Sequence, residues 1–168
     1  MNIWRMVVLA AAAAIAWAAP ARADECDTIA AKVHTQDPAI AVSERVTQDQ
    51  SVFVTLKNPH VDELKLTCAD ADASTPAALT AKANATWPST EFYDVLSSTG
   101  AVVLASTGAA IRSGSVLCAQ RAMTATTSNA VYDVNGMRFE CTTTSGPGGS
   151  TLIHISKLKE AQPQAQPQ

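Results

Sequence analysis

The chain has 168 residues, a formal net charge of −3 and 47% hydrophobic residues, which suits one globular domain. The chain is mildly acidic and has no basic patch. It therefore lacks the positively charged surface with which proteins bind nucleic acid or an anionic membrane. Only 5% of the residues are aromatic, so the core must rest on Val, Leu, Ile and alanine, and alanine buries little area.

The first 23 residues have the features of a secretory signal peptide. A short segment with one positive charge, Met1 to Arg5, precedes an alanine-rich apolar run from Met6 to Ala19. Ala21-Arg22-Ala23 fits the small-x-small pattern, so we expect cleavage after Ala23. The apolar run is shorter than the about 20 residues of a membrane-spanning helix. We therefore expect a periplasmic or secreted chain of 145 residues, with 10 basic and 15 acidic side chains and no membrane attachment.

Four cysteines follow the expected cleavage site: Cys26, Cys68, Cys118 and Cys141. An even number in an exported chain predicts two disulfides, and four cysteines allow three pairings. Each bond would stabilise the fold by about 3–4 kcal/mol in the chain-entropy model. No CxxC occurs, and no cysteine has a histidine at the spacing of a zinc site. Disulfides are therefore favoured over a metal site, and no cofactor is predicted.

In chain order, the segment 24–34 predicts a short helix, because apolar residues recur there at helical spacing. The Asp37-Pro38 pair ends this helix, since a residue before proline avoids the helical region. Residues 39–50 fit either a helix or an edge strand. Alternating apolar residues then predict a strand over 52–57 and a returning strand over 64–68, which carries Cys68 on its inward face.

A polar loop is expected over 69–76, and a weaker third strand near the end of 77–87. Trp87-Pro88 closes the first half, because proline cannot donate to a sheet ladder. Residues 89–106 fit either a helix capped by Ser89 or a hairpin, and the apolar spacing favours the helix. A second helix is predicted over 109–123, where Gly114 weakens it by about 1 kcal/mol relative to alanine.

The strongest turn signal is Asn135-Gly136, the preferred pair for a type I′ hairpin turn. The runs VYDV and MRFECT on either side of it predict two strands, with Arg138 and Glu140 on the outer side of the second. A glycine-rich loop, Gly146 to Gly149, leads to a third strand over 151–156 that places His154 outward.

Together these elements predict an α+β fold, in which an antiparallel sheet of two hairpin or meander units carries two to three short helices on one face. In each half, 24–87 and 89–160, a helix with a cysteine precedes a hairpin whose second strand ends in a cysteine. This similarity suggests an internal α-β-β duplication and favours the pairings Cys26–Cys68 and Cys118–Cys141. We expect a single domain over 24–161 and a disordered tail over 162–168.

The leading functional hypothesis is a non-enzymatic binding or structural module that acts through a protein partner, because no catalytic or metal-binding motif is found in the sequence. One alternative is a small hydrolase-like enzyme with a site assembled from scattered polar residues such as His60, Asp62 and Glu63. Another is a secreted inhibitor that uses the loop 146–149.

The outer side of the last hairpin gathers three polar side chains: Arg138, Glu140 and His154. They are candidates for contact with a partner or a small ligand. The plainer interpretation is that they solvate an exposed sheet face through modest cross-strand interactions.

Overall fold

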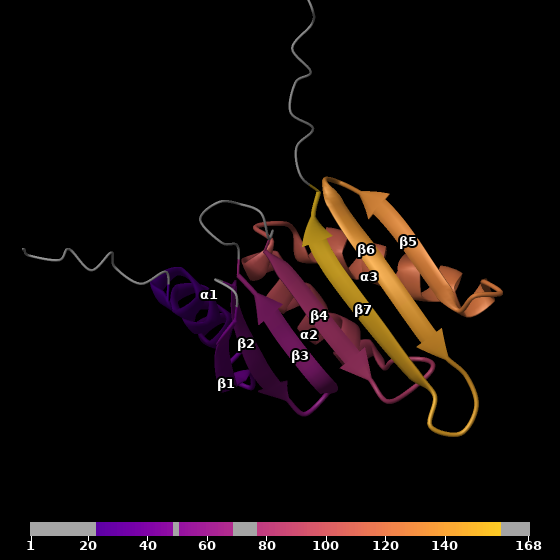
Figure 1. Ribbon diagram of the computed structural model, residues 1–168, viewed down its shortest axis with the longest axis horizontal. Coiled ribbons are helices and arrows are strands. Elements are labelled where there is room, and N and C mark those ends of the chain that lie inside the picture. Colours follow the sequence, from indigo (N-terminus) through magenta and orange to yellow (C-terminus); the bar gives the residue numbers. More distant parts are fainter. Residues whose placement is uncertain (1–22, 49–50, 69–76, 159–168) are drawn as a thin grey trace, which may run out of the picture.

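The computed structural model describes residues 23–48, 51–68 and 77–158, which form one antiparallel sheet with three helices on one side (Figure 1). The helices are α1 (Ala23–Gln36), α2 (Thr90–Val103) and α3 (Gly108–Thr124). The strands are β1 (Ala41–Gln48), β2 (Ser51–Asn58), β3 (Val61–Thr67), β4 (Ala78–Ala83), β5 (Asn129–Val134), β6 (Met137–Thr144) and β7 (Ser150–Lys157). The predicted α+β class, with an antiparallel sheet and helices on one face, is confirmed.

The strand order in the sheet is β1-β2-β3-β4-β7-β6-β5. Two meanders, β2-β3-β4 and β5-β6-β7, therefore meet where β4 pairs with β7. The third strand of the first half was expected near the end of 77–87, but β4 occupies the start of that segment and lies at the centre of the sheet. Ala81 and Ala83 suit this place, because small side chains on the helix side let α2 pack closely over β4.

The ambiguous segment 39–50 contains an edge strand, β1, and not a helix. All eight residues of β1 are exposed, and the pairing register with β2 shifts between Val42 and Glu44. A β-bulge and charged side chains are common on edge strands, where they discourage pairing with other chains. Without a buried face, this strand leaves no clear alternation in the sequence.

The segment 89–106 contains a helix and not a hairpin. Ser89 is the N-cap of α2, and its hydroxyl accepts a hydrogen bond from the Phe92 amide at 3.3 Å. Thr107 caps α3 in the same way, with the Ala110 amide 3.2 Å from its hydroxyl. These caps satisfy amides that otherwise lack partners at a helix start.

Gly114 has a role in α3 that helix propensity does not show. A Cβ built on this residue would lie 2.3 Å from Cζ of Phe139 on β6. Phe139 is fully buried, and its ring fills the space beside the glycine. Gly114 therefore allows α3 and β6 to approach closely around this ring.

Two disulfides fasten helices to the sheet, Cys26–Cys68 from α1 and Cys118–Cys141 from α3. Their Cα–Cα distances are 5.7 and 5.8 Å, and both pairings are those that the sequence favoured. Two disulfides indicate folding in an oxidising environment. None of the described helices combines the length and the apolar character needed to cross a bilayer.

The internal duplication stays a hypothesis. The two halves share the order helix, then meander, but β1 has no equivalent in the second half and α2 has none in the first. The expected signal peptide, the loop 69–76 and the tail 162–168 lie outside the described residues, apart from Ala23, the first residue of α1.

Candidate interaction surface

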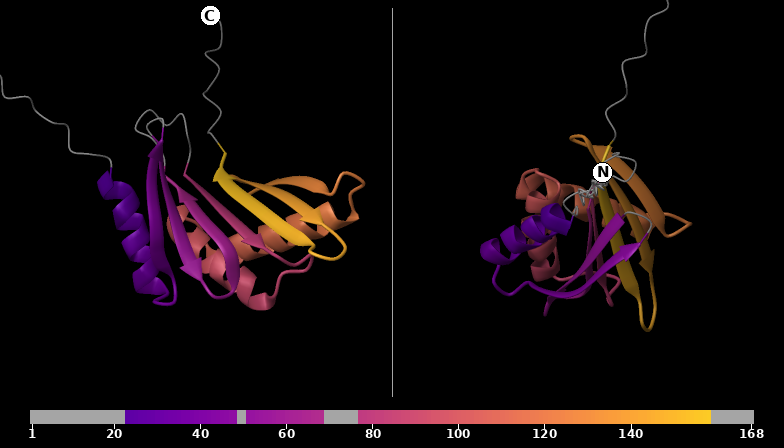
Figure 2. Two further views of the ribbon diagram at one scale, coloured as in Figure 1. Left: turned by 60° about the horizontal axis from the view of Figure 1, so that its bottom comes forward. Right: turned by 60° about the vertical axis from the view of Figure 1, so that its left-hand side comes forward.

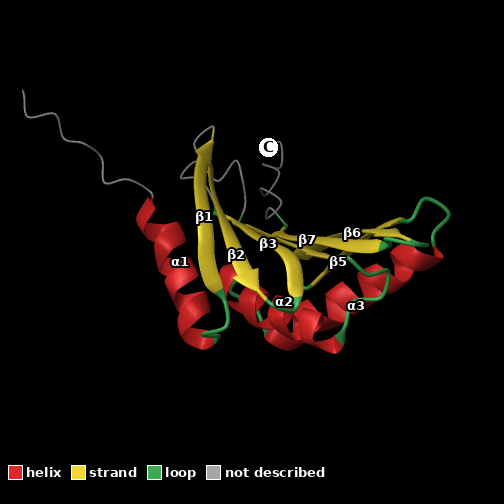
Figure 3. Ribbon diagram, turned by 90° about the horizontal axis from the view of Figure 1, so that it is seen from below, coloured by secondary structure: helices red, strands yellow, loops and turns green. Residues whose placement is uncertain are grey.

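The face of the sheet opposite the helices is covered by no described element (Figure 3). The sheet is bent, so that β1 and β2 stand steeply against β5, β6 and β7, and the helices lie outside the bend (Figures 2 and 3). The uncovered face is thus the concave side of the sheet. We call it the open face; its middle row consists of Thr55, Lys65, Thr80, His154, Glu140 and Val131.

The three predicted contact residues lie on the open face. Glu140 and His154 are directly opposite each other on β6 and β7, and Arg138 is opposite Ser156. The Nδ1 atom of His154 is hydrogen-bonded to the hydroxyl of Thr80 at 2.9 Å. This hydrogen bond links the two meanders, because Thr80 lies on β4 of the first and His154 on β7 of the second.

Arg138 is held by a residue that the sequence analysis did not single out. Its Nε and Nη2 atoms donate to the two carboxylate oxygens of Asp133, at 2.9 and 2.8 Å. These hydrogen bonds lower the pKa of Asp133 and raise the pKa of the Arg138 guanidinium. The signal was present in the sequence, because a two-residue turn at Asn135-Gly136 puts Asp133 opposite Arg138.

Apolar side chains on the open face are separated by polar ones. Val131 on β5 is 61% exposed, and Leu152 on β7 is 38% exposed. Val46 and Phe53 form a second apolar pair across β1 and β2. A mixture of this kind is ordinary for a protein surface, and the interfaces of non-permanent complexes are about as apolar as the rest of the surface.

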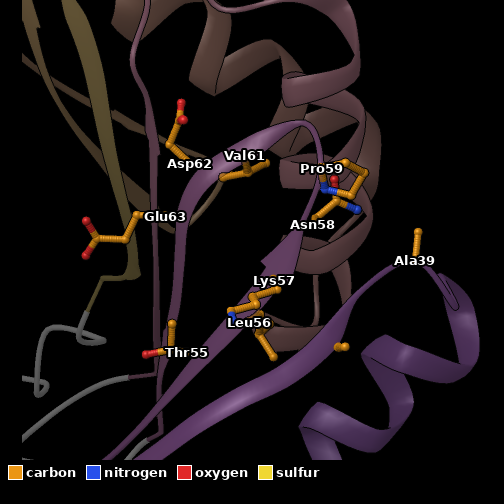
Figure 4. Close-up of a pocket in the computed structure, with 10 residues that line it drawn as sticks. Ala39, Thr55, Leu56, Lys57, Asn58, Pro59, Val61, Asp62 and Glu63 are labelled. Carbon is orange, nitrogen blue, oxygen red and sulfur yellow. The ribbon is translucent and has the colours of Figure 1, made fainter.

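The residues of the alternative site at the first hairpin line two different clefts. A cleft of about 500 Å³ beside the β2–β3 turn is lined in part by Asp62 and Glu63, whose side chains leave the strand in different directions (Figure 4). Asp62 accepts a hydrogen bond from the Asn84 amide at 2.6 Å, and Glu63 forms an ion pair with Lys65 at 2.5 Å. Both carboxylates therefore already have partners.

His60, the third of these residues, is in the same turn but lines a different cleft. It borders a separate hollow beside Glu91 and Asp94 of α2. Hydrogen bonds from the backbone N–H of Glu91 and from Ser89 lower the pKa of the Glu91 carboxylate, with a smaller contribution from the charge of His60. Asp62 and Glu63 thus line one cleft and His60 lines another.

The glycine-rich loop makes the β6–β7 turn. Gly146 and Gly148 have φ angles of 93° and 77°, a region that favours glycine. The base of the loop is fixed, because the Ser150 amide donates to the Thr144 hydroxyl at 2.8 Å. The glycines therefore have a conformational role in the turn, and the inhibitor alternative has no further observation in its favour.

Among the described residues, no group of three or more His, Cys, Asp or Glu side chains is placed to hold a metal ion.

The sequence analysis did not predict that Trp87 is exposed. This residue, on the loop between β4 and α2, is 67% exposed. The sequence placed it at a boundary before Pro88, where a tryptophan is as easily buried as exposed.

Comparisons with known proteins found no match. No family model matches the chain, and neither a curated protein nor a solved structure is significantly similar to it.

Proposed function

We propose that this protein is a non-enzymatic module of the periplasm or the extracellular space that binds a protein partner through its open face. The observation that carries the proposal is the width of that face. All three described helices lie on the other side of a sheet of seven strands, so no element that the structure describes covers the concave side.

The dimensions suit a protein partner. Seven strands spaced by about 4.8 Å and about 20 Å long give a projected area of about 600 Å². A standard protein–protein interface buries about 800 Å² of accessible surface on each partner. Because side chains make the accessible surface larger than its projection, one partner of ordinary size would use most of the open face.

Export is part of the proposal. The N-terminal 23 residues read as a signal peptide, and the two disulfides fit an oxidising compartment. Cross-strand hydrogen bonds orient the side chains of His154 and Arg138, which lowers the conformational entropy that these two side chains lose on binding.

Two leucines of nearly equal exposure provide the test. Leu152 on the open face is 38% exposed, and Leu117 on α3 is 39% exposed. We expect Leu152→Asp to abolish capture of a specific partner from the cell envelope, because it places a charge in the centre of the interface. Leu117→Asp is the matched control and should capture the partner as the wild type does.

Thermal unfolding of both variants checks that they fold. Equal capture by a folded Leu152→Asp variant, or loss of capture with Leu117→Asp alone, would contradict the proposal. Arg138→Ala is a milder test of the same face, and unchanged binding would remove Arg138 from the contact.

A further inference from the structure

The groove beside Trp87 is a second site, separate from the open face. It has a volume of about 580 Å³ and lies between the β4–α2 loop, the end of α3 and the end of β6. Eight residues line it: Thr86, Trp87, Gln120, Met123, Thr124, Ser128, Thr143 and Ser145. We propose that this groove binds a neutral saccharide.

Trp87 is displayed on a loop that is firmly held. The hydroxyl of Thr86 donates to the Thr144 carbonyl at 2.8 Å, and the hydroxyl of Thr151 donates to the Thr86 carbonyl at 2.9 Å. The residue next to Trp87 is thus tied to both strands of the β6–β7 hairpin, and the loops lie side by side (Figure 1). A rigidly presented aromatic side chain loses little entropy on binding.

The exposure of Trp87 is unexpected in a chain that has so few aromatic residues for its core. Aromatic residues make up only 5% of the chain, and Phe92 and Phe139 are used as fully buried core residues. Trp87 is instead the most exposed of the large hydrophobic residues described. An indole face beside a groove offers a flat apolar platform, which suits the C–H face of a sugar ring.

The polar groups of the groove define the chemistry of its ligand. None of the eight lining residues carries a charge, so a charged ligand would find no counter-ion there. The nearest cation on α3, Arg121, lies over the ring of Tyr132 at 4.4 Å from its centroid. Hydroxyls and the Gln120 amide both donate and accept hydrogen bonds, as sugar hydroxyls do.

Two of these groups are available for a ligand. The Gln120 amide and the Ser145 hydroxyl form no side-chain hydrogen bond with any other residue that the structure describes. They flank a groove whose apolar members are Trp87 and Met123. An apolar platform with uncharged donors and acceptors around it is the environment in which an uncharged sugar replaces its contacts with water.

The test is calorimetric titration of the full chain with maltohexaose, cellohexaose and chitohexaose, and with hexagalacturonate as the charged comparison. We expect at least one neutral hexasaccharide to bind and hexagalacturonate not to bind. Trp87→Ala should weaken the binding at least tenfold, whereas Trp87→Phe, which keeps an aromatic face, should weaken it less. Both variants should fold, because the side chain is 67% exposed.

Leu117→Ala is the control for loss of an exposed apolar side chain elsewhere, and it should bind as the wild type does. Leu152→Asp should also leave saccharide binding unchanged, which separates this groove from the open face. The inference is overturned if no neutral hexasaccharide binds, if hexagalacturonate binds as tightly, or if Trp87→Ala leaves the affinity unchanged.

Discussion

The two halves of the molecule use the same covalent connection in different packing environments. In each, a disulfide joins a helix to the second strand of a hairpin or to the residue that follows it. Among residues 25–36 of α1, whose burial is described, three are buried against the core: Cys26, Ala30 and Val33. The helix α3 buries six: Ile111, Gly114, Ser115, Cys118, Ala119 and Ala122.

This difference separates the contribution of a cross-link from that of packing. With so small a buried face, α1 depends on its disulfide to stay on the sheet. The helix α3 covers β5 and β6 with twice as many buried residues, so we expect packing alone to keep it in place. The disulfide of α1 therefore holds its helix in place, whereas the disulfide of α3 adds to a packing that is already sufficient.

Removal of the disulfides should have the largest effect. The bonds close loops with separations of 42 and 23 residues, so the chain-entropy model assigns them about 4 and about 3.5 kcal/mol of the free energy of unfolding. Urea unfolding of Cys26→Ala/Cys68→Ala and of Cys118→Ala/Cys141→Ala should show losses of that order.

Hydrogen exchange of the same two variants tests whether α1 and α3 differ in their dependence on the disulfide. We expect Cys26→Ala/Cys68→Ala to lose protection selectively in α1, because that helix detaches while the sheet persists. In Cys118→Ala/Cys141→Ala, the amides of α3 should exchange no faster than those of β6. Selective loss of α3 in the second variant would contradict our view of its packing.

Gly114→Ala should have the next largest effect. The added methyl group overlaps the Phe139 ring, so we expect a loss of about 1–3 kcal/mol in the free energy of unfolding. Gly108→Ala is the matched control in the same helix, because its Cβ would meet no atom closer than 3.4 Å. If Gly114→Ala instead raised stability by about 1 kcal/mol, helix propensity alone would govern this position.

Ser115→Ala should act in the opposite direction. The Ser115 hydroxyl is buried in α3 and finds no hydrogen-bond partner among the described residues. A buried hydroxyl without a hydrogen bond destabilises the folded state, because it has lost its contacts with water. Chemical denaturation of the variant should therefore show a free energy of unfolding that is higher by about 1 kcal/mol. A loss of similar size would mean that the hydroxyl makes a hydrogen bond in solution.

The smallest expected effect is the dependence of stability on pH through Asp133. The ion pair with Arg138 lowers the pKa of Asp133 in the folded state, so its contribution to stability is present above the ordinary aspartate value of about 3.9. That contribution is lost as the pH falls through the lowered folded value. NMR titration of the Asp133 carboxyl carbon should show a midpoint below 3.9, and Arg138→Ala should move it up towards that value.

Local features of the fold were predictable from the sequence. Asn135-Gly136 sets the turn and register of the last hairpin, and the repeated placement of cysteines indicated the correct disulfides. The position of β4 was not predictable, because its pairing with β7 joins segments about 70 residues apart and its alanines give no alternating pattern.

On the open face, the sequence predicted three exposed polar residues but not the residues to which they are hydrogen-bonded. Alternation along β6 and β7 placed Arg138, Glu140 and His154 on one face, and the structure adds Thr80 from the other half. The exposure of Trp87 was not predicted, because the exposure of a loop residue depends on tertiary contacts such as those of Thr86.

The most direct test of the central claim, that the open face binds a protein partner, is site-specific photocrosslinking in the cells that produce the protein. A photoreactive residue at Val131, which is 61% exposed on the open face, should form a discrete adduct with one other protein. The same residue at Leu117, on the helix side, should form none. Equal adducts from both positions, or an adduct from Leu117 alone, would contradict the claim.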